Sequence, residues 1–219
     1  TEIEYALRPN SNADAGAEYC FRLNRLSNFD GTYRLSSVSY YPNATAYAGV
    51  QVGVPTFTQN EYRWYEDNDA LQPTVPVAGE NSGAVGVSAS VQSVRLRMNV
   101  QVGTGQLNNG AQAFTLQYAG NSTSGPWVDV PADGAWRYDD NSGVTNGASI
   151  SATLLTSSDI KGPYVESLTT ASDYDTVAVG QDVEFDFSLD ISRTSLGTIY
   201  YFRIVKSGGT VLDAYTRYP

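Results

Sequence analysis

The chain carries a partial internal repeat, which constrains its fold more strongly than any other feature of the sequence. Residues 1–42 resemble the C-terminal residues 183–219, at an offset of about 180 residues. The matching segments are Ile3-Glu4-Tyr5 with Val183-Glu184-Phe185, Tyr19-Cys20-Phe21-Arg22-Leu23 with Tyr200-Tyr201-Phe202-Arg203-Ile204, and Tyr40-Tyr41-Pro42 with Arg217-Tyr218-Pro219. We therefore expect a partial repeat over residues 1–42, a linker over 43–56 and one complete repeat over 57–219.

Apolar and polar residues alternate strictly in two long segments of the complete repeat. In residues 94–102 the apolar side chains face one way, while Arg95, Arg97, Asn99 and Gln101 face the other. In residues 183–189 the apolar side chains are buried, and Glu184, Asp186 and Ser188 are left outside. A period of two residues is the period of a strand with one buried face. Both segments therefore predict half-buried strands.

Shorter alternating segments, separated by clusters of Gly, Asn, Asp and Pro, predict an all-β fold. Further strands are expected at residues 113–118, 127–130, 199–205 and 211–218, with either 63–65 or 56–58 opening the domain. Their order predicts an immunoglobulin-like or fibronectin-III-like β-sandwich, in which the strands from Val94 and Ala113 are B and C and the last three are E, F and G. Residues 1–42 then supply three extra E-F-G-like strands. Residues 141–174 are less regular, and a short helix and an extra strand are both open there.

The composition argues against an enzyme. The chain has no histidine and a single cysteine, Cys20. It therefore lacks the usual acid–base group at neutral pH, and Cys20 lacks a histidine base that would activate it as a nucleophile. One cysteine also forms neither an internal disulfide nor a cysteine-rich zinc site. We expect Cys20 to be a small buried residue and the protein to have no catalytic residues.

The charge and hydropathy of the chain exclude several classes of binding partner. The net charge of −10 repels nucleic acid and anionic lipid. No run of 18 apolar residues is present, so no membrane span is expected. Few lysines and abundant Ser, Thr, Asn, Gly and Tyr are typical of secreted surface-layer and pilus proteins. An extracellular, cell-surface location is therefore expected.

Several motifs, in order, resemble a tandem sandwich repeat of long secreted surface proteins from uncultured bacteria. They are Arg63-Trp64-Tyr65-Glu66-Asp67-Asn68-Asp69-Ala70-Leu71, Arg95-Leu96-Arg97, Phe114-Thr115-Leu116-Gln117-Tyr118, Ser124-Gly125-Pro126-Trp127-Val128-Asp129-Val130, and Tyr200-Tyr201-Phe202-Arg203 through Tyr218-Pro219. The resemblance covers most of residues 57–219, and residues 1–42 resemble the end of the repeat again. It implies surface display and no enzymatic activity.

The partial repeat is the candidate assembly segment, because strands without partners expose apolar residues along open edges. The residues concerned are Ile3, Tyr5, Leu7, Tyr19, Phe21 and Leu23. A neighbouring copy, a sheet of the same chain, or further repeats of a longer tandem array are the three candidate complements. A neighbouring copy gives strand complementation, and such a heterologous contact propagates into an open helical homopolymer.

Three further kinds of site are candidates. Acidic loops at Glu66, Asp67, Asp69, Asp139 and Asp140 offer oxygen ligands for calcium, without the spacing of a helix–loop–helix calcium loop. Solvated turn residues are the alternative, and no other cofactor is expected. Trp64, Trp127 and Trp136 are candidates for stacking on glycans, or else belong to the core. Asn43 and Asn121 each begin an Asn-x-Ser/Thr glycosylation motif.

The sequence thus predicts a structural subunit of an extracellular filament or pilus-like fibre, assembled head to tail by strand complementation. The alternative is a carbohydrate-binding or adhesive display module of a larger secreted protein. Exposed tryptophans and a monodisperse particle would distinguish the module from the filament subunit.

Overall fold

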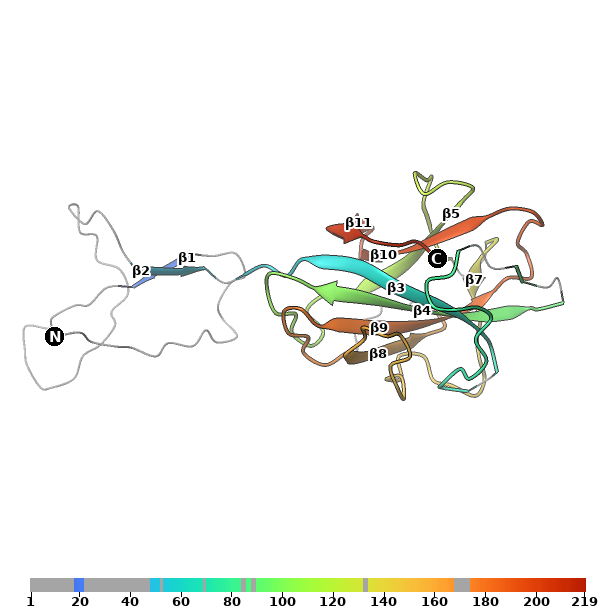
Figure 1. Ribbon diagram of the computed structural model, residues 1–219, viewed down its shortest axis with the longest axis horizontal. Coiled ribbons are helices and arrows are strands. Elements are labelled where there is room, and N and C mark those ends of the chain that lie inside the picture. Colours follow the sequence, from blue (N-terminus) through green and yellow to red (C-terminus); the bar gives the residue numbers. More distant parts are fainter. Residues whose placement is uncertain are drawn as a thin grey trace, which may run out of the picture. The chain divides into compact units, whose positions relative to one another are not determined.

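The computed structural model divides into two units, Thr1–Val54 and Pro55–Pro219 (Figure 1). It describes residues 53–68, 70–83, 86–87, 90–131, 134–167 and 174–219, together with the backbone of residues 18–21 and 48–51. Two strands are described in the first unit, β1 (Glu18–Phe21) and β2 (Ala48–Gln51). β2 lies within the segment expected to be a linker.

The second unit is all-β, as the sequence predicts, and its described residues contain no helix. Its strands are β3 (Phe57–Glu66), β4 (Ser93–Val102), β5 (Phe114–Gly120), β6 (Val128–Asp129), β7 (Arg137–Tyr138), β8 (Ile160–Val165), β9 (Asp182–Asp190), β10 (Tyr200–Lys206), β11 (Thr210–Val211) and β12 (Ala214–Tyr215). The two candidate opening segments, 56–58 and 63–65, belong to the single strand β3. The irregular segment 141–174 contributes the strand β8 and no helix among its described residues.

The strands form two sheets that pack face to face as a β-sandwich. The larger sheet has the order β12-β3-β4-β9-β7, and β8 pairs in parallel with β9. The smaller sheet has the order β11-β10-β5-β6. The finer immunoglobulin-like topology stays a prediction. The chain enters β3 at Phe57, at one end of the sandwich, while Glu66, Asp190 and Tyr200 lie at the other end.

The apolar faces of the two sheets form one core. Phe114 of β5 lies 5.4 Å, centroid to centroid, from both Phe57 of β3 and Phe185 of β9. Trp64 of β3 packs edge to face against Phe202 of β10 at 5.3 Å. These contacts join the sheets along their length, and the predicted inward-facing residues of 94–102 and 183–189 are all buried.

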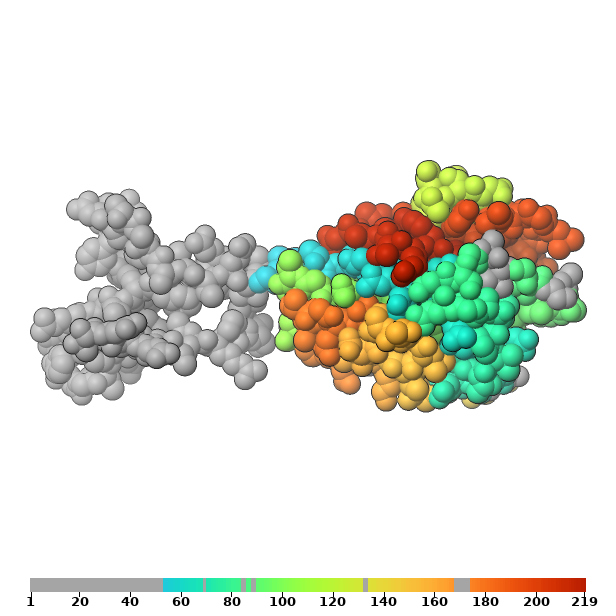
Figure 2. Space-filling model, in the orientation of Figure 1, coloured from blue at the N-terminus to red at the C-terminus, as the bar shows by residue number. Residues whose placement is uncertain are grey.

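The other face of the larger sheet is also buried, and here the prediction from alternation was wrong. Residues 95, 97, 99, 184, 186 and 188 were expected to face solvent, but their side chains are covered. The covering segments, 70–82 and 141–159, lie side by side over this face (teal and gold in Figure 2). They contact each other where Ser151 Oγ donates to Gln72 Oε1 at 3.1 Å. Alternation shows which residues share a face of a strand, but not what packs on that face.

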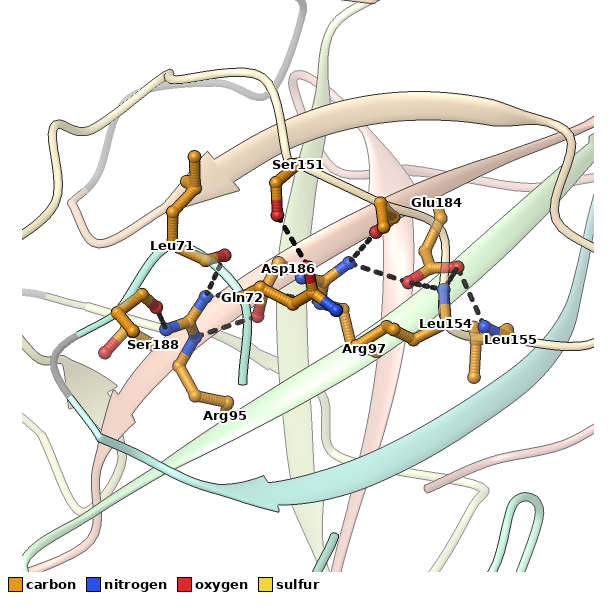
Figure 3. A network of polar contacts seen from close by, with 12 residues as sticks. Leu71, Gln72, Arg95, Arg97, Ser151, Leu154, Leu155, Glu184, Asp186 and Ser188 are labelled. Carbon is orange, nitrogen blue, oxygen red and sulfur yellow. Dashed lines mark hydrogen bonds and ion pairs between the residues drawn. The ribbon is translucent and has the colours of Figure 1, made fainter. Parts of the chain in front are cut away.

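A network of buried ion pairs occupies this second interface (Figure 3). Arg95 Nε donates to Asp186 Oδ1 at 3.0 Å, and Arg95 Nη2 bonds to Asp186 Oδ2. Arg97 Nη1 donates to Glu184 Oε1 at 2.8 Å, and Arg97 Nε forms an ion pair with Asp186 Oδ2 at 2.6 Å. All four side chains have no exposed surface. A charge buried this deeply requires such a partner.

The network also holds the covering segments in place. Glu184 Oε2 accepts hydrogen bonds from the amides of Leu154 and Leu155, at 2.9 and 3.0 Å. Arg95 Nη1 donates to the carbonyl of Ala70 at 2.8 Å. Burial raises the pKa of Glu184, and the positive charge of Arg97 and these amides partly offset that effect. Charged side chains of β4 and β9 therefore hold in place the backbone at Ala70, Leu154 and Leu155, which belongs to no strand.

Candidate assembly groove

The predicted assembly residues fall in the first unit. Ile3, Tyr5, Leu7 and Leu23 lie outside the described residues. Tyr19 and Phe21 lie in β1, together with Cys20, and only the backbone of that strand is described. What the structure adds is a pairing: β1 is antiparallel to β2, with Glu18 opposite Gln51 and Phe21 opposite Ala48.

The sequence repeat makes β1 equivalent to residues 199–202 at the start of β10. In the second unit these residues pair with β5, with Tyr200 opposite Gly120 and Phe202 opposite Tyr118. In the first unit the equivalent strand pairs with β2 instead. The same repeat segment is thus found with two different partner strands.

Most strands of the sandwich have both edges covered. β4 lies between β3 and β9, and β5 lies between β10 and β6. A neighbouring copy that docked in the manner of β9 and β10 would therefore have to displace those strands. The outer edge of β3 is covered by β12 and by hydrogen bonds between Val77 and Trp64. Added strands need another edge.

The outer edge of β10 is open over half of its length. β11 pairs only with Val205 and Lys206. The main-chain groups of Ile204 bond to side chains, with the amide donating to Gln59 Oε1 at 2.7 Å and the carbonyl accepting from Tyr215 Oη at 2.8 Å. Across the described parts of the chain, no strand pairs with this edge at residues 200–203. The amide of Phe202 makes one long bond there, to the carbonyl of Pro219 at 3.3 Å.

A groove of about 550 Å³ lies beside this edge, at the end of the sandwich opposite Phe57. Its floor is aromatic, formed by Trp64, Trp136, Tyr200 and Phe202, which contact one another at centroid distances of 4.6 to 6.0 Å. Its walls come from the loops that precede β4 and β10. The floor of the groove therefore belongs to the core of the sandwich.

The rim of the groove exposes apolar side chains. Leu196 is 88% exposed and Ile199 is 47% exposed, and the exposed Val87 belongs to the wall formed by the loop that precedes β4. Several polar residues line it as well, namely Gln92, Ser192, Thr194, Ser195 and Thr198. Exposed apolar side chains around an aromatic hollow are typical of a site that binds a partner.

The three tryptophans differ in how much ring surface is exposed for stacking on a glycan. Trp64 and Trp136 are only 9% and 7% exposed and belong to the core. Trp127 is half-buried: the Arg203 guanidinium lies 4.4 Å above its ring, and Tyr218 stacks on it at 5.6 Å. The Trp127 ring therefore already stacks on protein groups, and it anchors the C-terminal segment to the smaller sheet.

The acidic loops do come together, although arginine supplies the positive charge. Asp67 Oδ1 accepts from Asn141 Nδ2 at 3.1 Å and lies 3.7 Å from Arg95 Nη1. Glu66 and Asp140 are exposed, and Asp139 is half-buried. Asp69 is outside the described residues. Among those described, no three acidic, histidine or cysteine side chains are grouped to hold a metal ion.

Of the two glycosylation motifs, only that at Asn121 is described. Asn121 is exposed at the end of β5 and has a left-handed backbone conformation, with φ of 61°. Its Oδ1 accepts a hydrogen bond of 3.4 Å from the amide of Ile199.

Comparison with family models, curated proteins and solved structures finds no match to this chain. The resemblance to repeats of long secreted proteins therefore stays a prediction. Within the described segments, no helix is long and apolar enough to cross a membrane.

Proposed function

We propose that the chain is a structural subunit of an extracellular, cell-surface filament or pilus-like fibre, which assembles head to tail without catalysis. The observation that carries this proposal is the aromatic groove at one end of the sandwich, with Leu196 and Ile199 exposed on its rim. The partial repeat supplies the second half of the contact. It carries the six apolar residues named above. It comes before β3 in the sequence, and β3 begins at Phe57, at the end of the sandwich opposite the groove.

Two different surfaces at two ends favour an open polymer. The groove lies next to Tyr200, whereas the N-terminal segment enters the sandwich at Phe57. A contact between unlike surfaces is heterologous and leaves each surface free on the terminal subunits, so growth continues unless the rotation closes a ring. A closed two-fold dimer would need the same surface on both partners.

Burial of apolar side chains is the largest favourable term in such a contact. Six fully buried apolar side chains would contribute about 1.5–3 kcal/mol each, or roughly 9–18 kcal/mol in all. The loss of translational and rotational freedom costs about 4–15 kcal/mol, so the contact requires most of the six side chains to be buried.

The test is electron microscopy of the full chain, of a variant lacking residues 1–42, and of the double variant L196D/I199D. Of these three chains, only the full chain is expected to form filaments, and the control below is expected to form them as well. Val179→Asp is the matched control, because Val179 is 57% exposed but lies near Gln181, at the Phe57 end. Filaments that persist without residues 1–42 would refute the proposal.

A second candidate is a carbohydrate-binding or adhesive display module. It is favoured by one observation, the hydroxyl and amide side chains that line the groove beside its aromatic floor. Aromatic faces with a few placed polar groups are the usual composition of small-molecule sites. Uniform single particles from every variant, with glycan binding that Tyr200→Ala abolishes, would establish this function instead.

A further inference from the structure

The open edge of β10 and the groove beside it form one surface. Phe202 and Tyr200 line the groove with their side chains, and the same two residues lie on the stretch of β10 that no described strand covers. Main-chain groups of alternate residues point outward on this edge, as the bonds of Phe202 and Ile204 show. A strand added here would displace Pro219, which lines the groove and whose carbonyl accepts the 3.3 Å bond from the amide of Phe202.

The pairing of β1 with β2 supplies a template for such a strand. β1 is the repeat equivalent of residues 199–202, and it pairs with residues 48–51 in a defined register. We propose that residues 48–51 of a second copy add to the open edge of β10 as an antiparallel strand, in the register that β2 uses with β1. This inference rests on the proposed function: residues 48–51 closely follow the partial repeat, and the strand that they add fixes the register of the contact to which residues 1–42 contribute their apolar side chains.

The register determines which side chains meet. It places Ala48 opposite Phe202, Val50 opposite Tyr200 and Gln51 opposite Ile199. Residues directly opposite each other in a ladder project from the same face of the sheet. Val50 and Ala48 of the second copy therefore face the aromatic floor formed by Tyr200 and Phe202, whereas Gln51 projects beside Ile199 at the rim.

The exchange is cheap in free energy, since the strand leaves one aromatic partner for a similar one. In the sequence repeat, Tyr19 and Phe21 of β1 are equivalent to Tyr200 and Phe202 of β10. Exchanging equivalent elements between copies costs little because the same interactions re-form. The groove adds burial for Val50, and the hydrogen bonds of the ladder give the contact direction.

A disulfide test measures the register directly. In the full chain with Cys20→Ser, we introduce Gln51→Cys and Ile199→Cys, two positions expected to be directly opposite. Opposed strand residues have Cα atoms about 4.5–5.5 Å apart, within the range that a disulfide spans. We expect a ladder of covalently linked chains on a non-reducing gel. Gln51→Cys with Val211→Cys is the matched control, because Val211 is equally exposed on the same sheet but lies at its other end.

A second pair of variants separates face from register. Val50→Asp puts a charge against the aromatic floor and is expected to abolish filaments, whereas Gln51→Asn keeps an uncharged polar side chain beside Ile199 and is expected to leave them. Filaments without the 51–199 disulfide, or filaments that survive Val50→Asp, would overturn this inference while leaving the proposed function in place. A chain that stays monomeric at every concentration would overturn both.

Discussion

Asp186 is the acidic residue that both buried arginines share, so its neutralisation tests the account of the larger sheet. Asp186→Asn keeps the shape of the side chain but removes its charge, and an amide N–H then faces a guanidinium. Arg95 and Arg97 remain fully buried, with Asp67 and Glu184 as their acidic partners. Removing one member of a buried ion pair costs about 3–5 kcal/mol, because the other charge stays desolvated. We expect a loss of that size in the free energy of unfolding.

Urea unfolding followed by tryptophan fluorescence measures this loss, since all three tryptophans lie in the second unit. The corresponding fall in Tm is about 6–20 °C for a domain of this size. Asp140→Asn is the control: the same substitution at an exposed residue, expected to change stability by less than about 0.5 kcal/mol. If Asp186→Asn costs under 1 kcal/mol by the same measure, the network is not the buried, coupled structure described here.

Two further predictions concern the same sheet. In Gly162→Ala the new Cβ would lie 2.4 Å from the carbonyl oxygen of Glu184, so we expect the free energy of unfolding in urea to fall by about 1–3 kcal/mol. Gly86→Ala is the control, because the space around Gly86 is open and the substitution should leave stability unchanged. Burial raises the pKa of Asp190, but hydrogen bonds from Ser192 and Arg137 outweigh it, and the net shift is below the ordinary value of 3.8. A lowered pKa gives stability that is complete well above pH 3.8 and is lost as the pH falls through the folded value. The stability difference between the native chain and Asp190→Asn should therefore shrink below pH 3.8, and a difference that grew there would contradict the shift.

The strands could be predicted from the sequence because they obey a two-residue period. Residues 94–102 and 183–189 became the central strands β4 and β9, with the expected apolar residues in the core. What could not be predicted was the cover on their second face, since segments 70–82 and 141–159 have no period of their own. One signal was present: Arg95 and Arg97 on one strand, and Glu184 and Asp186 on another, have opposite charges at alternate positions. Such pairs are compatible with a salt-bridged surface or with a buried network, and only packing decides between them.

The groove was not predicted at all. Its aromatic floor comes from Trp64, Trp136, Tyr200 and Phe202, which are far apart in the sequence and meet only because β3 and β10 face each other. Two of the tryptophans considered for glycan stacking are part of that floor. Sequence patterns report which residues are apolar, whereas a concave surface depends on loop conformation at the end of the sandwich.

The parallel pairing of β12 with β3 has a mechanical consequence for a fibre. The amide of Asp213 donates to the carbonyl of Phe57 at 3.0 Å, that of Thr216 donates to Gln59 at 2.8 Å, and Gln59 Nε2 donates to the carbonyl of Arg217 at 2.7 Å. In a tandem array, where neighbouring units are joined through the chain, tension pulls β3 and the C-terminal segment in opposite directions along their length. These bonds are then sheared together instead of being opened one at a time. A unit connected in this way resists extension at its first and last strands, where the chain enters and leaves.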